Sequence, residues 1–140
     1  MKKPIFVNNE IYHVFNRGVE KRTTFLDKQD HFRFIHCLFE FNDTKSFANL
    51  RRSMFEVEPR TFGQPRTFGS RKKKEREPRE LLVEVLAFCQ MPNHFHLLLR
   101  QKKENGVVRF MQKLGTGYTM YFNQKYKRVG ALFQGRYKAV

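Results

Sequence analysis

The chain has 140 residues, and 28 Lys and Arg residues against 13 Asp and Glu residues give it a formal net charge of +15. This length fits one domain with its own hydrophobic core, and no apolar run is long enough to span a membrane. The positive charge predicts a polyanionic partner, with nucleic acid ahead of a membrane surface. Because Met1-Lys2-Lys3-Pro4 is not followed by the apolar segment of a signal peptide, we expect a soluble, cytoplasmic protein without a membrane partner.

The first predicted element is a strand over residues 11–15, which ends at the turn Asn16-Arg17-Gly18. A helix is predicted over residues 28–41, with Asp27 as its N-cap. Apolar residues recur along it at helical spacing, and we expect them to face the core. These residues are Phe32, Ile35, Leu38 or Phe39, and Phe41.

The next forty residues contain a tandem copy and a run of charge. Pro59-Arg60-Thr61-Phe62-Gly63 recurs as Pro65-Arg66-Thr67-Phe68-Gly69, and Arg71-Lys72-Lys73-Lys74 follows directly. Two copies are too few for a repeat protein, and this composition is typical of a solvated segment. We therefore predict one domain over residues 1–140 with a basic, mobile insertion at about residues 43–80.

Two apolar strands are predicted on either side of Pro92-Asn93. Because side chains alternate along a strand, His94 and His96 share one face, opposite to Phe95. Their Cα atoms would stand roughly 6.6 Å apart, so both imidazoles could reach one divalent ion at about 2.0–2.1 Å. The sequence therefore predicts two metal ligands, although such a pair also occurs as ordinary exposed or hydrogen-bonded histidines.

The two cysteines, Cys37 and Cys89, lie in apolar sequence and are interpreted as buried free thiols. A structural zinc site formed by Cys89, His94 and His96 is an alternative that lacks a fourth ligand at a recognisable spacing.

A second helix is predicted to begin at Asn105 or Gly106 and to end at Gly130, before an extended segment over residues 131–138. Gly115 and Gly117 weaken this helix unless they allow a close approach to a neighbour. Its apolar seam consists of Val107, Met111, Leu114, Tyr118 and Tyr121.

The order strand, helix, insertion, strand, strand, helix, strand predicts an α+β fold. This order of elements is typical of a ferredoxin-like (RRM-like) sandwich, in which two helices cover one face of an antiparallel sheet. The other face of the sheet is then free for a ligand. If His94 and His96 point toward it, they lie where a nucleic-acid strand could bind.

Four blocks of sequence, in this order, resemble the REP-associated tyrosine transposases. This family belongs to the single-tyrosine HUH transposases of the insertion-sequence type, named for a His-hydrophobic-His motif. The blocks are Tyr12-His13-Val14-Phe15-Asn16-Arg17-Gly18; Met91-Pro92-Asn93-His94-Phe95-His96-Leu97-Leu98-Leu99; Phe110-Met111-Gln112-Lys113 with Tyr118-Thr119 and Tyr121-Phe122-Asn123; and Leu132-Phe133-Gln134-Gly135-Arg136-Tyr137-Lys138.

The resemblance implies DNA transposition by a metal-dependent endonuclease and strand transferase that acts on single-stranded, hairpin-bearing DNA. His94 and His96 would hold Mg²⁺ or Mn²⁺, and a tyrosine would attack the scissile phosphate. A homodimer is a further expectation. The residues expected to contact phosphates or bases are Asn16, Arg17, Lys113 and Arg136.

The sequence departs from the family at the nucleophile, which lies in a Tyr-Ile-x-x-Asn-Pro motif beyond the Gln-Gly-Arg segment. The sequence given stops at Val140, before such a motif. Tyr118 is a weak candidate to replace it, because like Tyr121 it falls on an apolar helix seam, and Tyr12 and Tyr137 have no better claim. We therefore expect DNA binding with impaired or absent cleavage.

A non-catalytic nucleic-acid-binding module is the alternative function. Ferredoxin-like sheets that bind RNA stack bases on exposed aromatic side chains, and the sequence contains 16 Phe residues. Dependence on a metal ion separates this alternative from an HUH enzyme.

Overall fold

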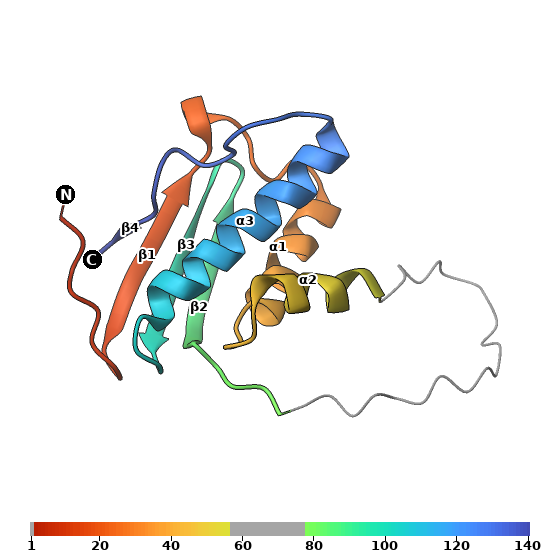
Figure 1. Ribbon diagram of the computed structural model, residues 1–140. Coiled ribbons are helices and arrows are strands. Elements are labelled where there is room, and N and C mark those ends of the chain that lie inside the picture. The colour runs from red at the N-terminus through yellow and green to blue at the C-terminus, as the bar shows by residue number, and fades with distance from the viewer. Residues whose placement is uncertain (1, 57–77) are drawn as a thin grey trace, which may run out of the picture.

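A computed structural model describes residues 2–56 and 78–140 (Figure 1). Four strands form one sheet in the order β2-β3-β1-β4, and all neighbouring strands are antiparallel. The helices lie on one face of the sheet (Figure 1), so the predicted ferredoxin-like α+β sandwich is confirmed. The elements are β1 (Ile11–Arg17), the single 3-10 turn η1 (Val19–Lys21), α1 (Lys28–Glu40), α2 (Phe47–Glu56), β2 (Val83–Met91), β3 (His94–Gln101), α3 (Gly106–Tyr126) and β4 (Lys138–Ala139).

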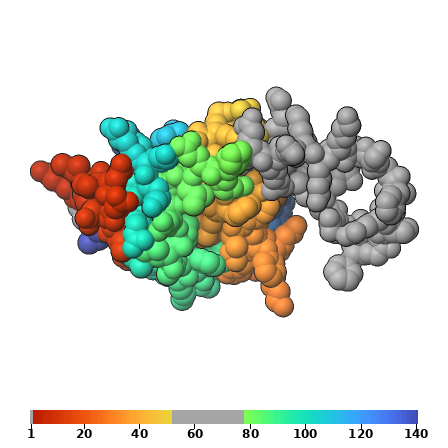
Figure 2. All heavy atoms as spheres, turned by 90° about the horizontal axis from the view of Figure 1, so that it is seen from below, coloured from red at the N-terminus to blue at the C-terminus, as the bar shows by residue number. Residues whose placement is uncertain are grey.

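The order of the strands is visible at the lower end of the sheet. Seen from below, residues leading into β1 (red), at the end of β3 (cyan) and in β2 (green) lie side by side in that order (Figure 2). Only Pro92 and Asn93 separate β2 from β3, so the two strands form a tight hairpin. β3, which carries both predicted metal ligands, is therefore held between β2 and β1.

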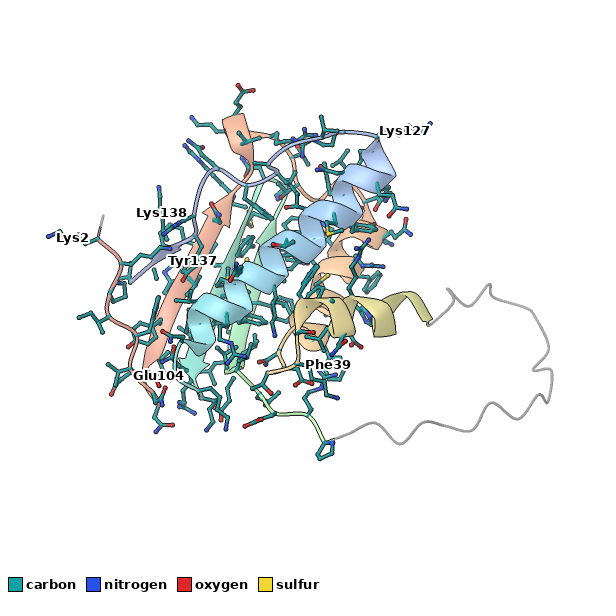
Figure 3. All side chains as sticks on the ribbon, in the orientation of Figure 1. Lys2, Phe39, Glu104, Lys127, Tyr137 and Lys138 are labelled. Carbon is teal, nitrogen blue, oxygen red and sulfur yellow. The ribbon has the colours of Figure 1, made fainter. Side chains whose placement is uncertain are left out.

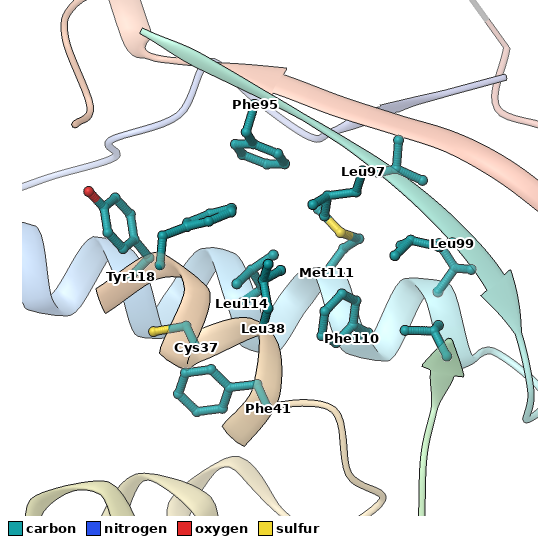
Figure 4. Packing of buried hydrophobic residues seen from close by; sticks show 14 of the residues in the cluster. Cys37, Leu38, Phe41, Phe95, Leu97, Leu99, Phe110, Met111, Leu114 and Tyr118 are labelled. Carbon is teal, nitrogen blue, oxygen red and sulfur yellow. The ribbon is translucent and has the colours of Figure 1, made fainter. Parts of the chain in front are cut away.

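The core lies between the sheet and the helices. Phe95, Leu97 and Leu99 project from β3 toward α1 and α3, as Figure 4 shows. Phe110 and Leu114 of α3 meet them, and all five side chains are at most 2% exposed. The alternation predicted for β3 is therefore confirmed on its buried face.

The predicted apolar face of α1 is partly wrong. Phe32 and Phe39 are 68% and 56% exposed, and Ile35 is also exposed. The helix carries a second stripe with the same period, beginning at Asp30, and this stripe faces α3. Its buried apolar members, with the residue that caps the helix, are Phe34, Cys37, Leu38 and Phe41.

The Asp30 carboxylate is fully buried between α1 and α3. It accepts hydrogen bonds from the Leu26 backbone N–H at 2.9 Å, the Tyr121 hydroxyl at 2.8 Å and the Tyr126 hydroxyl at 2.5 Å, and Lys125 Nζ lies 2.9 Å away. Burial alone would raise the pKa of the Asp30 carboxyl, but these donors outweigh it and lower the pKa to about 2. This network joins the first turn of α1 to the last turns of α3.

Part of the predicted insertion is ordered structure. Helix α2 occupies residues that were expected to form a mobile loop, and its Leu50 is buried in the core. The tandem copy and the charge run lie outside the described residues. Within the described part of the chain, no helix is both long and apolar enough to cross a membrane.

The C-terminal boundaries also differ from the prediction. Helix α3 ends at Tyr126 rather than at Gly130, because Lys127 adopts a left-handed backbone conformation with φ of 51°. The extended segment predicted for residues 131–138 pairs as a strand only at Lys138 and Ala139, apart from a bridge between Phe133 and Gly18.

The two glycines inside α3 should respond oppositely to alanine. A Cβ at Gly115 would meet nothing within 4 Å, whereas one at Gly117 would overlap the buried ring of Phe41. Gly115→Ala should therefore stabilise the protein by up to about 1 kcal/mol through helix propensity. Gly117→Ala should destabilise it, because overpacking costs about 1–3 kcal/mol. Urea denaturation gives both free energies of unfolding, and a Gly117→Ala variant as stable as Gly115→Ala would contradict the packing.

Candidate functional site

His94 and His96 lie on the face of the sheet that the helices leave open. Both side chains are partly exposed, whereas Phe95 between them is 2% exposed on the opposite face. Their ring centroids are 5.1 Å apart and the rings are nearly perpendicular. This separation is short enough for both Nε2 atoms to reach one ion at about 2.1 Å.

Each of these two imidazoles has a partner at Nδ1. Asn93 Oδ1 lies 2.7 Å from His94 Nδ1, and His13 Nε2 lies 2.8 Å from His96 Nδ1. An amide oxygen only accepts hydrogen bonds, so Nδ1 of His94 carries the proton and its Nε2 keeps a lone pair. Nε2 of His96 is free in the same way when His96 Nδ1 is the donor in its hydrogen bond with His13. The contact with Asn93 therefore holds His94 in the tautomer that coordinates through Nε2.

His13 was missed as a functional residue, because its place beside His96 depends on the register of β1 on β3. In the sheet, Phe15 pairs with His96 and His13 pairs with Leu98, so His13 lies diagonally across from His96 on the open face. Burial, then the neighbouring imidazoles of His13 and His94, lower the pKa of His96 below its usual value. The neutral form, which has the free lone pair, is therefore favoured.

Asn93 also ties the β2–β3 turn to the chain that follows β1. Its carbonyl oxygen accepts a hydrogen bond from the Gly18 N–H at 2.8 Å, and its Nδ2 donates to the Lys21 carbonyl at 3.3 Å. The side chain that orients His94 is thus itself fixed by the η1 turn.

Two imidazole nitrogens suit a divalent ion that completes its coordination shell with water or phosphate oxygens. Across residues 2–56 and 78–140, no group of three or more His, Cys, Asp or Glu side chains is placed to hold a metal ion. Cys89 pairs with His96 in the sheet and is exposed rather than buried as predicted, but it does not complete such a set. The imidazole nitrogens of His94 and His96 therefore fit two ligands of a divalent ion. The alternative, a structural zinc site that includes Cys89, gains no support.

A pocket of about 350 Å³ adjoins His94. Its lining contains two cationic side chains and no carboxylate, which suits a phosphate group. The Arg17 guanidinium is held in place by donation from Nε to Gln134 Oε1 at 3.0 Å. The residues that line this pocket, hereafter the His94 pocket, are Phe15, Asn16, Arg17, His94, Gln134 and Lys138.

Comparison with known proteins now identifies the family. The family model described as "Transposase IS200 like" matches residues 70–140, which is 71 of the 140 residues. The chain belongs to the IS200-like transposase family. No curated protein matches the sequence.

Two solved structures share the fold of this IS200-like transposase chain. One is a REP-associated tyrosine transposase bound to a REP hairpin, with a TM-score of 0.56 and 9% sequence identity. The match covers 100% of this chain but only 60% of that protein. The other is a candidate transposase from Deinococcus radiodurans R1, with a TM-score of 0.54, 15% identity, and coverage of 100% and 85% respectively.

The structure brings only two of the four predicted DNA contacts to the His pair. Asn16 and Arg17 line the His94 pocket, whereas Arg136 lines a separate, larger groove. Lys113 lies elsewhere on α3, where Nζ donates to the backbone carbonyls of Asp43 and Lys45. These internal hydrogen bonds indicate a structural role for Lys113. The lysine at the His94 pocket is instead Lys138, which appears with Lys2 at the β4 side of the molecule in Figure 3.

In the part of this IS200-like transposase chain that the structure describes, no tyrosine hydroxyl forms a hydrogen bond with His94 or His96. Tyr118 is fully buried on the helix side of the sheet, and its hydroxyl donates to the Thr24 carbonyl at 2.5 Å. Burial, then the nearby Asp30 carboxylate, raises the pKa of Tyr118, which opposes formation of a phenolate. Tyr121 and Tyr126 bind Asp30, also on the helix side. The remaining tyrosines are Tyr12, whose hydroxyl bonds the backbone at Ile5 and Val7, and Tyr137, which lines the larger groove.

Proposed function

We propose that this chain is the DNA-binding and metal-binding domain of a single-tyrosine transposase that acts on single-stranded, hairpin-bearing DNA. The observation that supports this most directly is the position of His94 and His96. They share the open face of the sheet, next to a pocket with two cations and no carboxylate. Membership of the IS200-like transposase family also supports a role in DNA transposition.

The residues of the His94 pocket have distinct roles in this proposal. Arg17 and Lys138 bind a phosphate of the DNA strand through charge-assisted hydrogen bonds. His94 and His96 hold a divalent ion, Mg²⁺ or Mn²⁺, oriented by Asn93 and His13. When bound, the ion supplies positive charge to the phosphate oxygens during phosphoryl transfer.

We further propose that the 140 residues bind DNA without cleaving it. Of the five tyrosines, Tyr12 and Tyr118 have hydroxyls bonded to the backbone, Tyr121 and Tyr126 bind Asp30, and Tyr137 packs against the core and lines the larger groove. A nucleophile for the phosphate in the His94 pocket therefore has to come from outside this set. Formation of a homodimer through a sheet edge stays a prediction. In this sheet β2 is an edge strand that could pair with a second copy.

The open face offers little for the alternative function, a platform that stacks bases. Phe15 is the aromatic residue beside the His pair, and its ring lies 4.9 Å from that of His13 and 5.7 Å from that of His96. A single phenylalanine covered by histidines is a small stacking surface compared with the two or three bases that RNA-binding sheets accommodate.

Binding of a labelled hairpin with a single-stranded flank tests the proposal. Fluorescence anisotropy should show tighter binding than to a blunt duplex of the same length, and EDTA should weaken binding several-fold relative to Mn²⁺. Denaturing gels should show no covalent protein–DNA adduct. Equal binding in EDTA and Mn²⁺ would favour the stacking alternative, and an adduct at any tyrosine would overturn the absence of cleavage.

Salt dependence of the same assay separates two of the basic residues. Arg17→Ala should reduce the slope of log affinity against log salt by about 0.7, the value for one phosphate contact on a single strand. Lys113→Ala should leave the slope unchanged, because Lys113 is engaged by backbone carbonyls. A reduced slope for Lys113→Ala would place DNA on the outer side of α3.

A further inference from the structure

A groove of about 780 Å³ runs along α3, opposite the C-terminal segment that leads into β4. Val108, Gln112, Thr116 and Thr119 of α3 form one wall. Phe133 and Tyr137 belong to the facing segment, and Figure 3 shows Tyr137 next to α3. This volume lies in the range of small-molecule sites, about 300–1,000 Å³. The space is thus large enough for a nucleotide.

The polar side chains of the α3 wall have no partners inside the described structure. The side chains of Gln112, Thr116 and Thr119 make no hydrogen bond to any other residue among 2–56 and 78–140. Amide and hydroxyl groups of this kind bind the edges of nucleic-acid bases. The aromatic ring of Tyr137 on the other side offers a surface on which a base can stack.

The charge of the groove suits a nucleic-acid strand. Its lining contains two cations, Lys3 and Arg136, and no carboxylate. Lys3 Nζ lies over the Tyr137 ring, 3.6 Å from its centroid, so this lysine covers one face of the ring and the other face is the surface on which a base can stack. The segment from Arg100 to the C-terminus contains ten Lys and Arg residues, and Glu104 is its one acidic residue.

The groove and the pocket beside the metal ligands share one lining residue. Asn16 lines both the groove and the His94 pocket. It is fixed there by donation from Nδ2 to the Gly135 carbonyl at 3.2 Å and by acceptance at Oδ1 from the Arg17 N–H at 2.9 Å. A DNA strand with one phosphate in the His94 pocket can therefore place a neighbouring nucleotide in the groove.

We propose that this groove binds an unstacked base of the single-stranded DNA, next to the phosphate held beside His94. The base stacks on Tyr137 and its edge meets the free polar groups of α3, while Lys3 and Arg136 hold the adjoining phosphate. This inference rests on the proposed function, because it requires a single strand at the His94 pocket.

Gly115 allows the groove to be filled without disturbing the core. It lines the groove, and a Cβ at this position meets nothing within 4 Å. Gly115→Trp should therefore occupy the groove, whereas Gly115→Ala adds one methyl group and serves as the matched control. Circular dichroism confirms that both variants are folded.

The test uses single-stranded oligonucleotides that carry 2-aminopurine at successive positions. With the wild-type chain and with Gly115→Ala, quenching at one position should report a base stacked on an aromatic ring. With Gly115→Trp, the bound protein should no longer protect the 2-aminopurine at this position from quenching by iodide. The affinity for the oligonucleotide should also fall about tenfold, the effect of losing one stacked base. Mn²⁺ binding at the His pair should be unchanged.

The outcomes distinguish the two proposals. If Gly115→Trp binds like the wild type and shields the same 2-aminopurine, the groove does not bind a base, and the proposed function is unaffected. If the wild-type chain binds none of the oligonucleotides, both proposals fail. Loss of shielding at one position in Gly115→Trp, with the Gly115→Ala control intact, supports the groove.

Discussion

Replacing His94 or His96 by alanine should reduce the affinity for Mn²⁺ by more than about 100-fold. Each substitution removes one of two nitrogen ligands, and loss of an outer partner alone typically costs 10–100-fold. Imidazole ligands favour Mn²⁺ over Mg²⁺, which prefers an all-oxygen shell. Electron paramagnetic resonance of Mn²⁺, measured with a single-stranded oligonucleotide present, gives the affinity directly.

Two further histidines provide the controls for this measurement. His13→Ala should weaken Mn²⁺ binding by about 10–100-fold, because His13 orients His96 without belonging to the pair. His36→Ala should change nothing, because His36 is an exposed residue of α1 whose neighbour is Glu40. Full Mn²⁺ affinity in either His94→Ala or His96→Ala would end the assignment of this pair as ligands.

Asp30→Ala should be the most destabilising single substitution among those considered, at about 3–5 kcal/mol. It would leave the Lys125 ammonium and the hydroxyls of Tyr121 and Tyr126 without their shared acceptor. Such a loss is a large fraction of the stability of a typical domain. Urea denaturation at neutral pH measures it. Asp27→Ala is the comparison, because it removes an exposed N-cap worth about 1 kcal/mol and an exposed ion pair with the same Lys125 but leaves the buried carboxylate in place.

The same carboxylate should give the protein a characteristic acid transition. The pKa of Asp30 is lowered from 3.8 to about 2 on folding, so the folded state prefers the charged form. Its contribution is complete above the unfolded-state pKa near 4 and is lost as the pH falls toward 2. The difference between the two pKa values corresponds to roughly 2 kcal/mol in the free energy of unfolding. If Asp30→Ala lost stability between pH 4 and pH 2 as steeply as the wild type, another group would be responsible.

Local sequence signals predicted the elements that depend on local rules. Alternation placed His94 and His96 opposite Phe95, and the N-cap Asp27 does accept a hydrogen bond from the Asp30 N–H. The close approach considered for the two glycines holds at Gly117, which packs against Phe41. In each case the determining interaction lies within a few residues or follows from the period of the element.

Predictions failed where a distant partner decides the outcome. The stripe with Phe32 and the stripe with Phe34 repeat at the same helical spacing, and contacts with distant elements select the second. These contacts are the Asp30 network to α3 and the packing of Phe34 against the sheet. For Lys113, a DNA contact stays a prediction, but the backbone carbonyls that its Nζ binds, about seventy positions away, could not be foreseen from the local sequence. His13 became visible as a partner of His96 only through the register of β1 on β3.

Asn93 gives the hairpin turn a consequence that reaches beyond its two residues. Through three hydrogen bonds it connects a backbone N–H after β1, a carbonyl of η1 and the imidazole of His94. The side-chain amide of Asn93 thus contributes both to holding the η1 turn and to orienting a predicted metal ligand. A substitution at Asn93 should therefore weaken the packing of this turn and the binding of the ion together.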